Sequence, residues 1–199
     1  MSKRQLRSGV SRTEVSRSVS VAIQHRLLAQ DWWAAAFVAG LYRAQPDEPG
    51  TELLLADLLA RGMRVAVPAR RGRGYGWAEA DANTRWRAGA HGIPEPARIR
   101  PVTPAELRVV VVPGLAFDPR GGRLGHGQGH FDRLLADSGA LMVGLCPERR
   151  LVAEVPQEPH DVRMDVVVTE KRVLYGAEAA AKIERILGAG GRAGRPEQG

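Results

Sequence analysis

The sequence predicts a layered α/β fold with a mainly parallel central sheet. Apolar runs of strand length alternate with helix-length segments over most of the 199 residues, which is the order of elements typical of such folds. Residues 109–112 are four valines followed by Pro113, the pattern of a central parallel strand that is buried on both faces. The length suits one domain with a substantial core, which we place at residues 1–187.

The first part of the chain is expected to hold helical sequence followed by a buried strand. Apolar residues recur near helical spacing over residues 1–30, with Gly9 and neighbouring serines as a place where the helix divides and Asp31 as its end. Residues 32–42 form an apolar run with few residues that break regular structure. We therefore predict a buried strand there, before a turn-rich loop at residues 45–50.

Shorter elements follow this loop. Thr51 is placed to cap a leucine-rich helix that ends at Gly62, and residues 64–68 predict a strand. Residues 91–96 are expected to be irregular because two prolines bar a helix there. The remaining predictions are a helix at residues 130–136, strands at 141–145 and 166–169, a final helix at 177–187 and a flexible Gly/Arg tail at 188–199.

Composition restricts the class of protein. Hydrophobic residues make up 44% of the chain and charged residues 26%, the balance of a soluble globular protein. A membrane span needs roughly twenty apolar residues, so none is expected, nor a membrane partner. No apolar segment follows the basic N-terminus, so no secretory signal is predicted. The single cysteine, Cys146, fits a reducing compartment, and we expect a cytoplasmic location.

The positive charge favours anionic ligands. Lysine and arginine number 29 against 22 acidic residues, a net charge of +7. This balance suits nucleotides and polyglutamates as well as nucleic acids. Because the arginines are scattered and not gathered on one helix, we expect small anionic molecules and no nucleic-acid partner. A nucleic-acid binder remains a third alternative, which a steep salt dependence of oligonucleotide affinity would reveal.

The most informative segment is a glycine-rich loop at residues 113–133, between the predicted central strand and a helix start. Backbone N–H groups in such a loop can converge on an anion, and the helix dipole adds favourable potential for phosphate. The loop lacks the Gly-Lys-Ser/Thr of a Walker motif and the glycine spacing of a dinucleotide fingerprint. From spacing alone, a phosphate site and a plain flexible loop are equally supported.

Longer motifs decide between these two interpretations. The run Pro113-Gly114-Leu115-Ala116-Phe117-Asp118, then Gly-x-Arg-Leu-Gly-x-Gly-x-Gly and an aromatic-Asp-Arg ending at Arg133, resembles the signature of the 5-formyltetrahydrofolate cyclo-ligase family, also called methenyltetrahydrofolate synthetase. Three more stretches resemble family motifs in the expected order: Lys-x-x-Leu-Arg at residues 3–7, the glutamate and threonine at 48–51, and the Pro…His-Asp…Asp segment at 156–165.

The resemblance implies a fold and a reaction. The fold would be a three-layer α/β sandwich akin to the NagB/RpiA-like folds. The reaction would be ATP-dependent cyclisation of 5-formyltetrahydrofolate to 5,10-methenyltetrahydrofolate, with release of ADP and phosphate and with Mg²⁺ bound beside the phosphates. The partners would then be ATP and a folate that can carry a polyglutamate tail, and we expect a monomer. The alternative is a non-catalytic relative that binds a nucleotide or a folate.

The resemblance also implies roles for particular residues. It assigns nucleotide contacts to Lys3, Arg4, Gln5, Leu6 and Arg7, and to Arg123, Leu124, Gly125, His126, Gly127, Gln128, Gly129, His130 and Phe131. Lys3 and Arg7 are four residues apart on one face of the predicted helix, so both can reach one anion; without the resemblance they would be interpreted as a solvated basic N-terminus. Arg123 and Asp132 are the candidate catalytic residues.

The remaining assignments concern the metal and the folate. Asp132 and Asp161 are the candidate Mg²⁺ ligands, since this ion prefers hard oxygen donors; the ordinary alternative for Asp132 is a carboxylate that complements a helix N-terminus. Glu48 is the candidate folate ligand, able to accept hydrogen bonds from the pterin, and otherwise a turn residue. Trp77 is a candidate wall of the pterin site, although such a residue is more often part of a core.

The sequence departs from the family pattern at a few side chains. Tyrosines are common around the glycine-rich loop in the family, where this chain has His126, His130 and Phe131. Arg149 and Arg150 stand where Phe-Gln is common. We expect these changes to affect side-chain contacts of the loop more than its backbone contacts.

Overall fold

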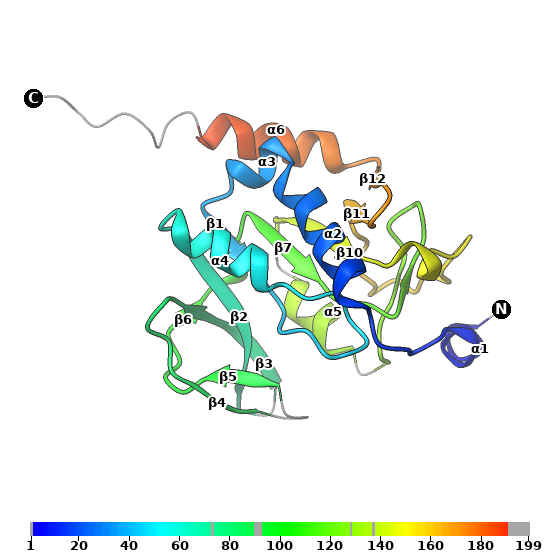
Figure 1. Ribbon diagram of the computed structural model, residues 1–199, viewed down its shortest axis with the longest axis horizontal. Coiled ribbons are helices and arrows are strands. Elements are labelled where there is room, and N and C mark those ends of the chain that lie inside the picture. Colours follow the sequence, from blue (N-terminus) through cyan, green and yellow to red (C-terminus); the bar gives the residue numbers. More distant parts are fainter. Residues whose placement is uncertain (1, 73, 90–92, 128, 137, 191–199) are drawn as a thin grey trace, which may run out of the picture.

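The computed structural model describes residues 2–72, 74–89, 93–127, 129–136 and 138–190, and its centre is an eight-stranded sheet (Figure 1). The strand order is β12-β11-β10-β7-β1-β2-β3-β6, and the five strands from β11 to β2 are parallel to one another. Their bounds are Val38–Gly40 (β1), Arg64–Arg71 (β2), Val109–Val112 (β7), Leu141–Leu145 (β10) and Val166–Val168 (β11). The prediction of an α/β fold with a mainly parallel sheet is therefore confirmed.

Antiparallel strands complete both edges of the sheet. At one edge, β3 (Gly74–Ala80) pairs with β2, and β6 (Pro101–Val102) pairs with β3. At the other edge, β12 (Val173–Tyr175) pairs with β11, and the sequence did not predict this strand.

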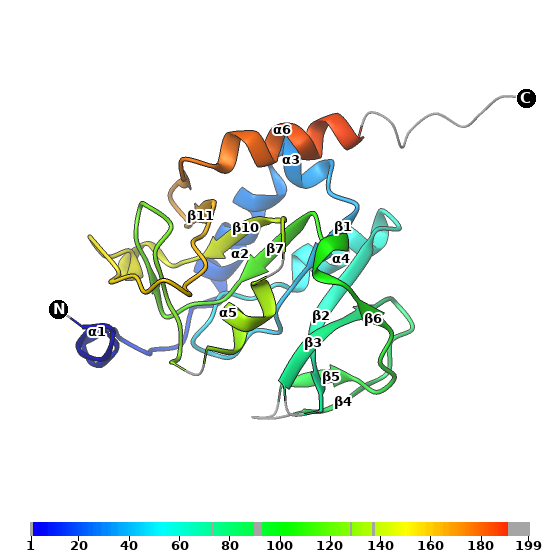
Figure 2. The same ribbon diagram turned by 180° about the vertical axis from the view of Figure 1, so that it is seen from behind.

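The valines of β7 show why the sheet needs cover on both faces. Val109 and Val111 belong to one apolar cluster and Val110 and Val112 to another, and all four are fully buried. This follows from the two-residue period of a strand. The first cluster is covered by α2 (Arg17–Leu28), α3 (Asp31–Ala34), α4 (Glu52–Ala60) and α6 (Ala179–Gly190), and the second by α5 (His130–Leu135) (Figures 1 and 2). The result is three layers.

The N-terminal helical sequence divides at the glycine and serines that suggested a break. The first piece is α1 (Lys3–Gly9), which begins at a capping box formed by Ser2 and Gln5, and the second is α2. The prediction that Asp31 ends the helical region is wrong, because Asp31 begins the short helix α3.

The predicted strand over residues 32–42 is also wrong for most of its length. Trp32 and Trp33 lie in α3, and only Val38–Gly40 forms a strand. A continuous apolar run is ambiguous because a buried helix and a buried strand both produce it. Here the tryptophans pack in the core from the helix, and the indole N–H of Trp33 donates a hydrogen bond of 2.9 Å to Asp57 Oδ2.

Two small hairpins occupy segments that were expected to be irregular or loop. Trp86–Ala88 (β4) pairs with Pro94–Pro96 (β5), so the prolines that bar a helix do not bar a short strand. Ala116–Phe117 (β8) pairs with Arg123–Leu124 (β9) within the glycine-rich segment. The glycine-rich segment is thus partly ordered by its own pairing.

The C-terminal helix runs three residues farther than predicted. Residues 188–190 belong to α6, which corrects the proposed start of the tail, and residues 191–199 lie outside the described part of the chain. The extent of a single domain at 1–187 stays a prediction. Among the described residues, every helix is too short or too polar to cross a membrane.

Candidate active site

A cavity of about 800 Å³ opens at the carboxyl ends of the central strands. Tyr42 and Pro113, which line it, follow β1 and β7 directly, and Pro68 lies within β2. Crevices outside the carboxyl ends of parallel strands are the usual ligand sites of open α/β sheets. The other walls come from α1, the glycine-rich loop, the start of α5, and the segment around Asp161.

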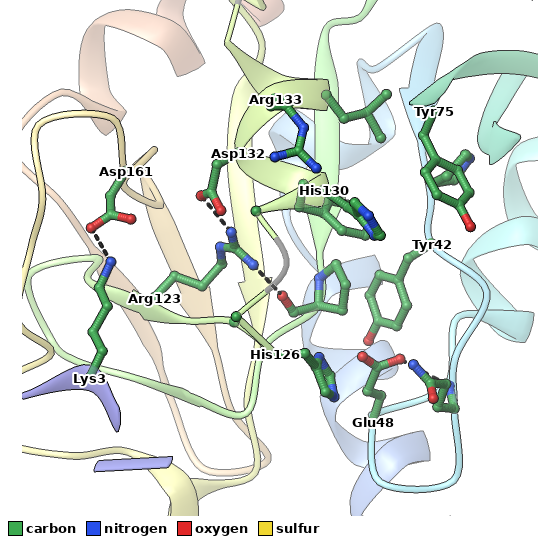
Figure 3. Close-up of a pocket in the computed structure, with 18 of the residues that line it drawn as sticks. Lys3, Tyr42, Glu48, Tyr75, Arg123, His126, His130, Asp132, Arg133 and Asp161 are labelled. Atoms are coloured by element: carbon green, nitrogen blue, oxygen red, sulfur yellow. Dashed lines mark hydrogen bonds and ion pairs between the residues drawn. The ribbon is translucent and has the colours of Figure 1, made fainter. Parts of the chain in front are cut away.

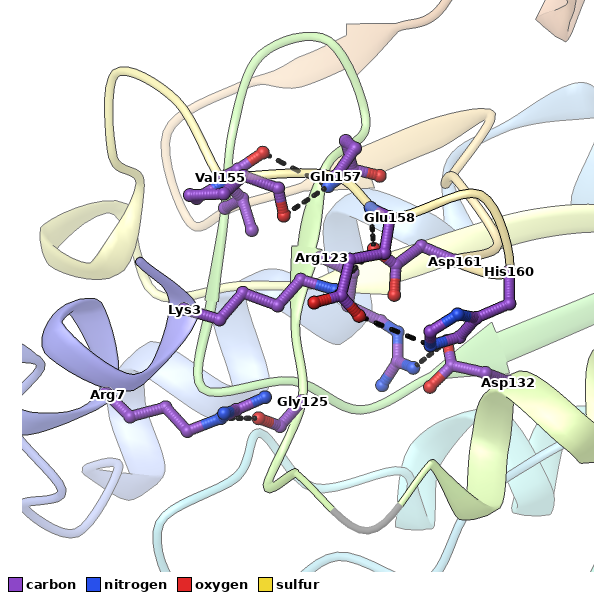
Figure 4. Close-up of polar contacts among 11 residues, drawn as sticks. Lys3, Arg7, Arg123, Gly125, Asp132, Val155, Gln157, Glu158, His160 and Asp161 are labelled. Atoms are coloured by element: carbon purple, nitrogen blue, oxygen red, sulfur yellow. Dashed lines mark hydrogen bonds and ion pairs between the residues drawn. The ribbon is translucent and has the colours of Figure 1, made fainter. Parts of the chain in front are cut away.

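The helix α1 forms one wall because a single leucine anchors it. Leu6 is buried against Leu115, Leu124 and Val155, which leaves the face that carries Lys3 and Arg7 toward the cavity. The Arg7 Nε–H donates a hydrogen bond of 2.9 Å to the carbonyl oxygen of Gly125 (Figure 4). Arg7 therefore contacts the glycine-rich loop directly, and Lys3 lines the same cavity.

The glycine-rich loop is held in shape by one buried carboxylate. Asp118 accepts hydrogen bonds from the backbone N–H groups of Gly122 at 2.9 Å and Val155 at 2.8 Å, and it is 1% exposed. Gly121 has a φ of 81°, and a Cβ there would overlap the carbonyl oxygen of Met164. Only glycine fits at this position, because any other residue would be strained at the positive φ and its Cβ would clash with Met164.

Two further glycines shape the part of the loop that faces the cavity. Gly127 has a φ of 96°, and Gly129 has a φ of 61° and caps the N-terminus of α5. A Cβ on Gly127 would lie 3.2 Å from the guanidinium carbon of Arg7. These positions keep the backbone accessible next to Arg7, which is the property that a phosphate-binding loop requires.

The two candidate catalytic residues form an ion pair. Arg123 Nη2 lies 2.6 Å from Asp132 Oδ1, and the two side chains are 6% and 17% exposed. The Nη1 of Arg123 donates to the carbonyl oxygen of Pro113 at 3.2 Å. Arg123 comes from β9 and Asp132 from the first turn of α5, so the pair joins the loop to the helix (Figure 3).

The second candidate metal ligand is paired in the same way. Lys3 Nζ forms a close ion pair with Asp161 Oδ2 and lies 3.7 Å from Glu158 Oε2 (Figure 4). Although burial acts in the opposite direction, the hydrogen bonds from Lys3 and from the Glu158 N–H lower the pKa of Asp161 below its usual range. Ligand atoms of Glu158, His160 and Asp161 lie within 4.8 Å of one another.

These contacts establish a charge-paired end of the cavity. Each candidate metal carboxylate contacts one candidate phosphate cation: Asp132 with Arg123 and Asp161 with Lys3. If a polyphosphate and a divalent cation bind here, each carboxylate can exchange its basic partner for the cation. Each basic side chain can exchange its carboxylate partner for a phosphate group. The residues present therefore fit a metal–nucleotide complex.

The opposite end of the cavity contains a buried carboxylate. Glu48 is 6% exposed and accepts a hydrogen bond of 2.9 Å from the backbone N–H of Gln45. Burial raises the pKa of Glu48 to about 7, and the negative charge of Asp47 acts in the same direction, whereas the Gln45 hydrogen bond and Arg150 oppose the shift. Such a carboxyl group is poised to bind a polar ligand group and to change protonation state near neutral pH.

Aromatic side chains stand beside Glu48. Tyr42 is fully buried, and its hydroxyl donates a hydrogen bond of 2.5 Å to the carbonyl oxygen of Pro49, which fixes the loop that presents Glu48. The rings of Tyr75 and His130 lie 5.1 Å apart across the cavity wall (Figure 3). This end can therefore hold a flat heterocycle against an aromatic ring and within reach of a hydrogen-bonding carboxyl group.

His126 lies between the two ends. Its Nε2 is 3.8 Å from Asp47 Oδ2, and burial lowers the pKa of His126 below its ordinary value while Asp47 acts to raise it. The imidazole thus connects the glycine-rich loop to the loop that carries Glu48 (Figure 3).

The structure does not bring every predicted site residue to the cavity. Trp77 is 1% exposed and donates an indole hydrogen bond of 3.3 Å to Leu134, within the core under α5. Leu6 and Leu124 are buried in a small apolar cluster and act as anchors. Gln128 lies outside the described residues. The other predicted residues that line the cavity are Lys3, Arg4, Arg7, Glu48, Arg123, Gly125, His126, Gly127, Gly129, His130, Phe131, Asp132 and Asp161.

Several lining residues were missed by the sequence analysis, and Tyr75 shows why. Tyr75 and Trp77 are two positions apart on β3 and so point to the same face of the sheet. Trp77 lies farther along the strand, beneath α5, whereas Tyr75 lies nearer the hairpin and reaches the cavity. The two-residue period of a predicted strand could have identified Tyr75 as a candidate, but only the position of α5 distinguishes the two rings. Arg43 and Glu95 also line the cavity and were not predicted.

Known proteins resemble this chain over most of its length. The model of the 5-formyltetrahydrofolate cyclo-ligase family matches residues 3–170. The 5-formyltetrahydrofolate cyclo-ligase of Mycolicibacterium smegmatis is 33% identical over 185 residues, which cover 86% of this chain and 95% of the relative.

Two solved structures are similar in fold. The 5,10-methenyltetrahydrofolate synthetase of Aquifex aeolicus superposes with a TM-score of 0.79 at 29% identity, covering 88% of this chain and 93% of that one. The synthetase of Mycoplasma pneumoniae has a TM-score of 0.66 at 18% identity, covering 85% and 99%, and shows the likeness of fold alone. With the family match over most of the chain, these findings show that the protein is an enzyme of the ligase class and belongs to the 5-formyltetrahydrofolate cyclo-ligase family.

Proposed function

We propose that this enzyme uses ATP to close 5-formyltetrahydrofolate into 5,10-methenyltetrahydrofolate, releasing ADP and phosphate. The observation that carries the proposal is the composition of the single cavity described above. One end has basic side chains and an accessible glycine backbone, and the other has Glu48 beside Tyr42. A polyphosphate and a pterin can therefore lie in one enclosed space, with their reacting groups near His126.

The chemistry requires this shared space. The formyl oxygen is a poor leaving group, and transfer of the γ-phosphoryl group to it makes it a good one. Nitrogen 10 of the folate then attacks the formyl carbon, the new C–N bond forms, and the C–O bond to phosphate breaks, so that phosphate leaves together with the proton from nitrogen 10. Phosphoryl transfer is catalysed mainly by positioning and by neutralising charge, so residues at both ends must hold the two substrates in line.

We assign roles to the residues by this requirement. Lys3, Arg7 and Arg123 would bind phosphate oxygens, and Gly125, Gly127 and Gly129 would offer backbone N–H groups. Glu48 would accept hydrogen bonds from the pterin. Asp132 and Asp161 would hold Mg²⁺, which supplies positive charge at the phosphates when bound. The ion pairs of Asp132 and Asp161 with Arg123 and Lys3 support this assignment, because they keep the carboxylates and cations at one end of the cavity.

A spectroscopic assay tests the proposal. The methenyl product absorbs in the near ultraviolet, so absorbance is followed after the protein is mixed with 5-formyltetrahydrofolate, ATP and Mg²⁺. We expect a rise that requires all three and that is accompanied by one phosphate per product. Calorimetry with each ligand serves as the second measurement. Binding of ATP or folate without turnover would instead identify a non-catalytic relative, and absence of both would overturn the proposal.

A further inference from the structure

A buried arginine lies behind the Glu48 loop, outside the cavity. Arg150 ends the short 3₁₀ helix η3 (Glu148–Arg150) and is 2% exposed, whereas its neighbour Arg149 is exposed. A fully buried arginine is unusual unless its guanidinium is hydrogen-bonded. Arg150 is absent from the cavity lining, so contact with a ligand there does not account for its burial.

The guanidinium of Arg150 joins two segments that are far apart in the sequence. Its Nη1 donates a close hydrogen bond to the carbonyl oxygen of Asp47, and its Nη2 donates one of 2.5 Å to that of Thr13. Asp47 precedes Glu48 in the loop at the folate end. Thr13 lies in the segment that connects α1, which carries Lys3 and Arg7, to α2.

The two segments also contact each other at this point. The Val15 N–H donates a hydrogen bond of 3.0 Å to the carbonyl oxygen of Pro46. In the part of the chain that the structure describes, the hydrogen bonds of the Arg149 side chain go to the connecting segment, with Nη2 3.2 Å from both Thr13 Oγ1 and the Glu14 carbonyl oxygen. Arg150 is therefore the member of this arginine pair that bridges to the Glu48 loop.

We propose that Arg150 is a positioning residue that fixes the Glu48 loop to the segment leading from α1, and so sets the geometry and charge of Glu48 from behind. Its two donors satisfy one carbonyl oxygen on each segment, and a planar guanidinium holds both in a fixed relation. Asp47 Oδ2 also lies 3.8 Å from Nε2 of His126, which lines the cavity. Movement of Asp47 would therefore change the folate end and the midpoint of the cavity together.

The charge of Arg150 gives the proposal a signature beyond packing. Among the described residues, the charges that shift the pKa of Glu48 are those of Asp47 and Arg150. Its neighbour Tyr42 also faces Glu52 and Cys146, and His126 faces Asp47, Arg12 and Arg123. Arg150 stabilises the ionised form of Glu48 and lowers its pKa, against the raising effects of burial and Asp47. A change that removes the positive charge should therefore raise this pKa further.

The first test needs no ligand. Arg150→Met keeps the length and volume of the side chain but removes the charge and both hydrogen bonds, Arg150→Lys keeps the charge, and Arg149→Met is the matched control. Amide hydrogen exchange is measured at Val15 and Glu48, whose N–H groups bond to Pro46 and Gln45. We expect exchange about tenfold faster or more in Arg150→Met, a smaller change in Arg150→Lys, and rates within twofold of wild type in Arg149→Met.

The second test follows the Glu48 carboxyl carbon by ¹³C NMR titration, with Glu48→Gln used for assignment. We expect its midpoint near pH 7 in the wild type and at least about half a unit higher in Arg150→Met, with Arg150→Lys close to wild type. If Arg150→Met does not fold, Arg150→Lys still decides: a midpoint close to that of the wild type, with exchange modestly faster than in the wild type, supports the proposal, and a midpoint raised by half a unit or more overturns it. Equal effects of Arg149→Met and Arg150→Met would also overturn it.

The third measurement rests on the proposed function. Arg150→Met should raise the KM for 5-formyltetrahydrofolate about tenfold while changing the KM for ATP less than threefold. If the wild-type protein shows no turnover, the proposed function is contradicted, whereas the hydrogen-exchange and NMR tests of Arg150 remain valid. Normal exchange and an unchanged Glu48 midpoint, with turnover intact, would overturn the role of Arg150 alone.

Discussion

The two ends of the cavity handle charge in opposite ways. At the charge-paired end, which we propose as the nucleotide end, Asp132 and Asp161 are each matched by a basic side chain, and the pKa of Asp161 is held low. At the opposite end, which we propose as the folate end, Glu48 is buried with a backbone hydrogen bond and a more distant arginine, and burial raises its pKa to about 7. The first end is prepared for exchange of ionic partners, and the second holds an incompletely compensated carboxyl group that a ligand can satisfy.

This difference indicates how the charges at each end affect the stability of the folded protein. Matched charges at the nucleotide end compensate one another before a ligand arrives, so the fold does not bear an isolated buried charge there. Glu48 has no such compensation, and its ionised form destabilises the fold at neutral pH. The two ends should therefore respond differently to substitution, pH and metal.

The largest effect is expected for Asp132→Asn. The amide oxygen can still accept the hydrogen bond from Arg123, but it is a poor ligand for Mg²⁺. We expect turnover to fall about a hundredfold or more, equivalent to about 3 kcal/mol of transition-state stabilisation. Turnover is measured against Mg²⁺ concentration, with the melting temperature recorded in parallel.

Asp57→Asn is the matched control, because Asp57 also pairs with an arginine, at 2.8 Å, on a helix away from the cavity. We expect its turnover to remain that of the wild type. Wild-type turnover and Mg²⁺ dependence in Asp132→Asn would show that the charge of Asp132 is not needed. Neutral hydrogen bonding would then suffice at both ends of the cavity.

Glu48→Gln should stabilise the folded protein at high pH. The native pKa of about 7 lies above the ordinary 4.5, so the native state keeps a proton that the unfolded chain loses in this window. Stability due to Glu48 is therefore full below pH 4.5 and falls as pH rises through 7. We expect the variant to gain about 3 kcal/mol in the free energy of unfolding at pH 8 and nothing at pH 4.

Urea denaturation at the two pH values measures this difference, and Glu158→Gln provides an exposed glutamate for comparison. Calorimetry of the same Glu48 variant should show weaker folate binding with nearly unchanged ATP binding. An equal gain in the free energy of unfolding at pH 4 and pH 8 would mean that the glutamine stabilises the fold by packing. The ionised carboxylate of Glu48 would then not destabilise the folded protein.

Lys3→Ala should affect the nucleotide end alone. The substitution removes the cation next to Asp161 and leaves that carboxylate next to the polyphosphate site. We expect the KM for ATP to rise about tenfold and the KM for folate to change less than twofold. Steady-state kinetics with each substrate varied measure both constants, and Arg17→Ala, at the exposed start of α2, controls for the loss of one positive charge. Equal increases in both constants would remove the distinction between the ends.

The smallest effect is expected for Tyr75→Leu. The leucine keeps an apolar wall but loses the ring that lies 5.1 Å from that of His130. We expect folate affinity to fall about threefold, within the range of one aromatic contact, with ATP affinity unchanged. Direct calorimetry measures both, and Tyr175→Leu, at an exposed ring on the sheet edge, is the control. A larger loss for ATP than for folate would place Tyr75 at the other end.

Regular elements were predictable where local pattern and buried environment agree. Three predicted elements are confirmed: the four valines of β7, the run at Leu141–Leu145 and the helix that starts at His130. Glycine or proline lies close to an end of each segment, and this limits its length and therefore the kind of element that it can form. The run from Trp32 to Tyr42 failed because apolar content does not distinguish a short helix from a strand. The strand β12 was missed because three residues at an edge carry little periodicity.

The candidate site divides along the same line. By itself the sequence determined the layered α/β class, the glycine-rich loop and, through its motifs, the residues Lys3, Arg7, Arg123, Asp132, Asp161 and Glu48, since these depend on residue type and spacing along the chain. Only the tertiary structure decided that Asp161 pairs with Lys3 across 158 positions, that Tyr75 and not Trp77 reaches the cavity, and that Arg150 lies behind Glu48. Burial and ion pairing depend on which distant segments meet, and that is a property of the folded chain that no local pattern contains.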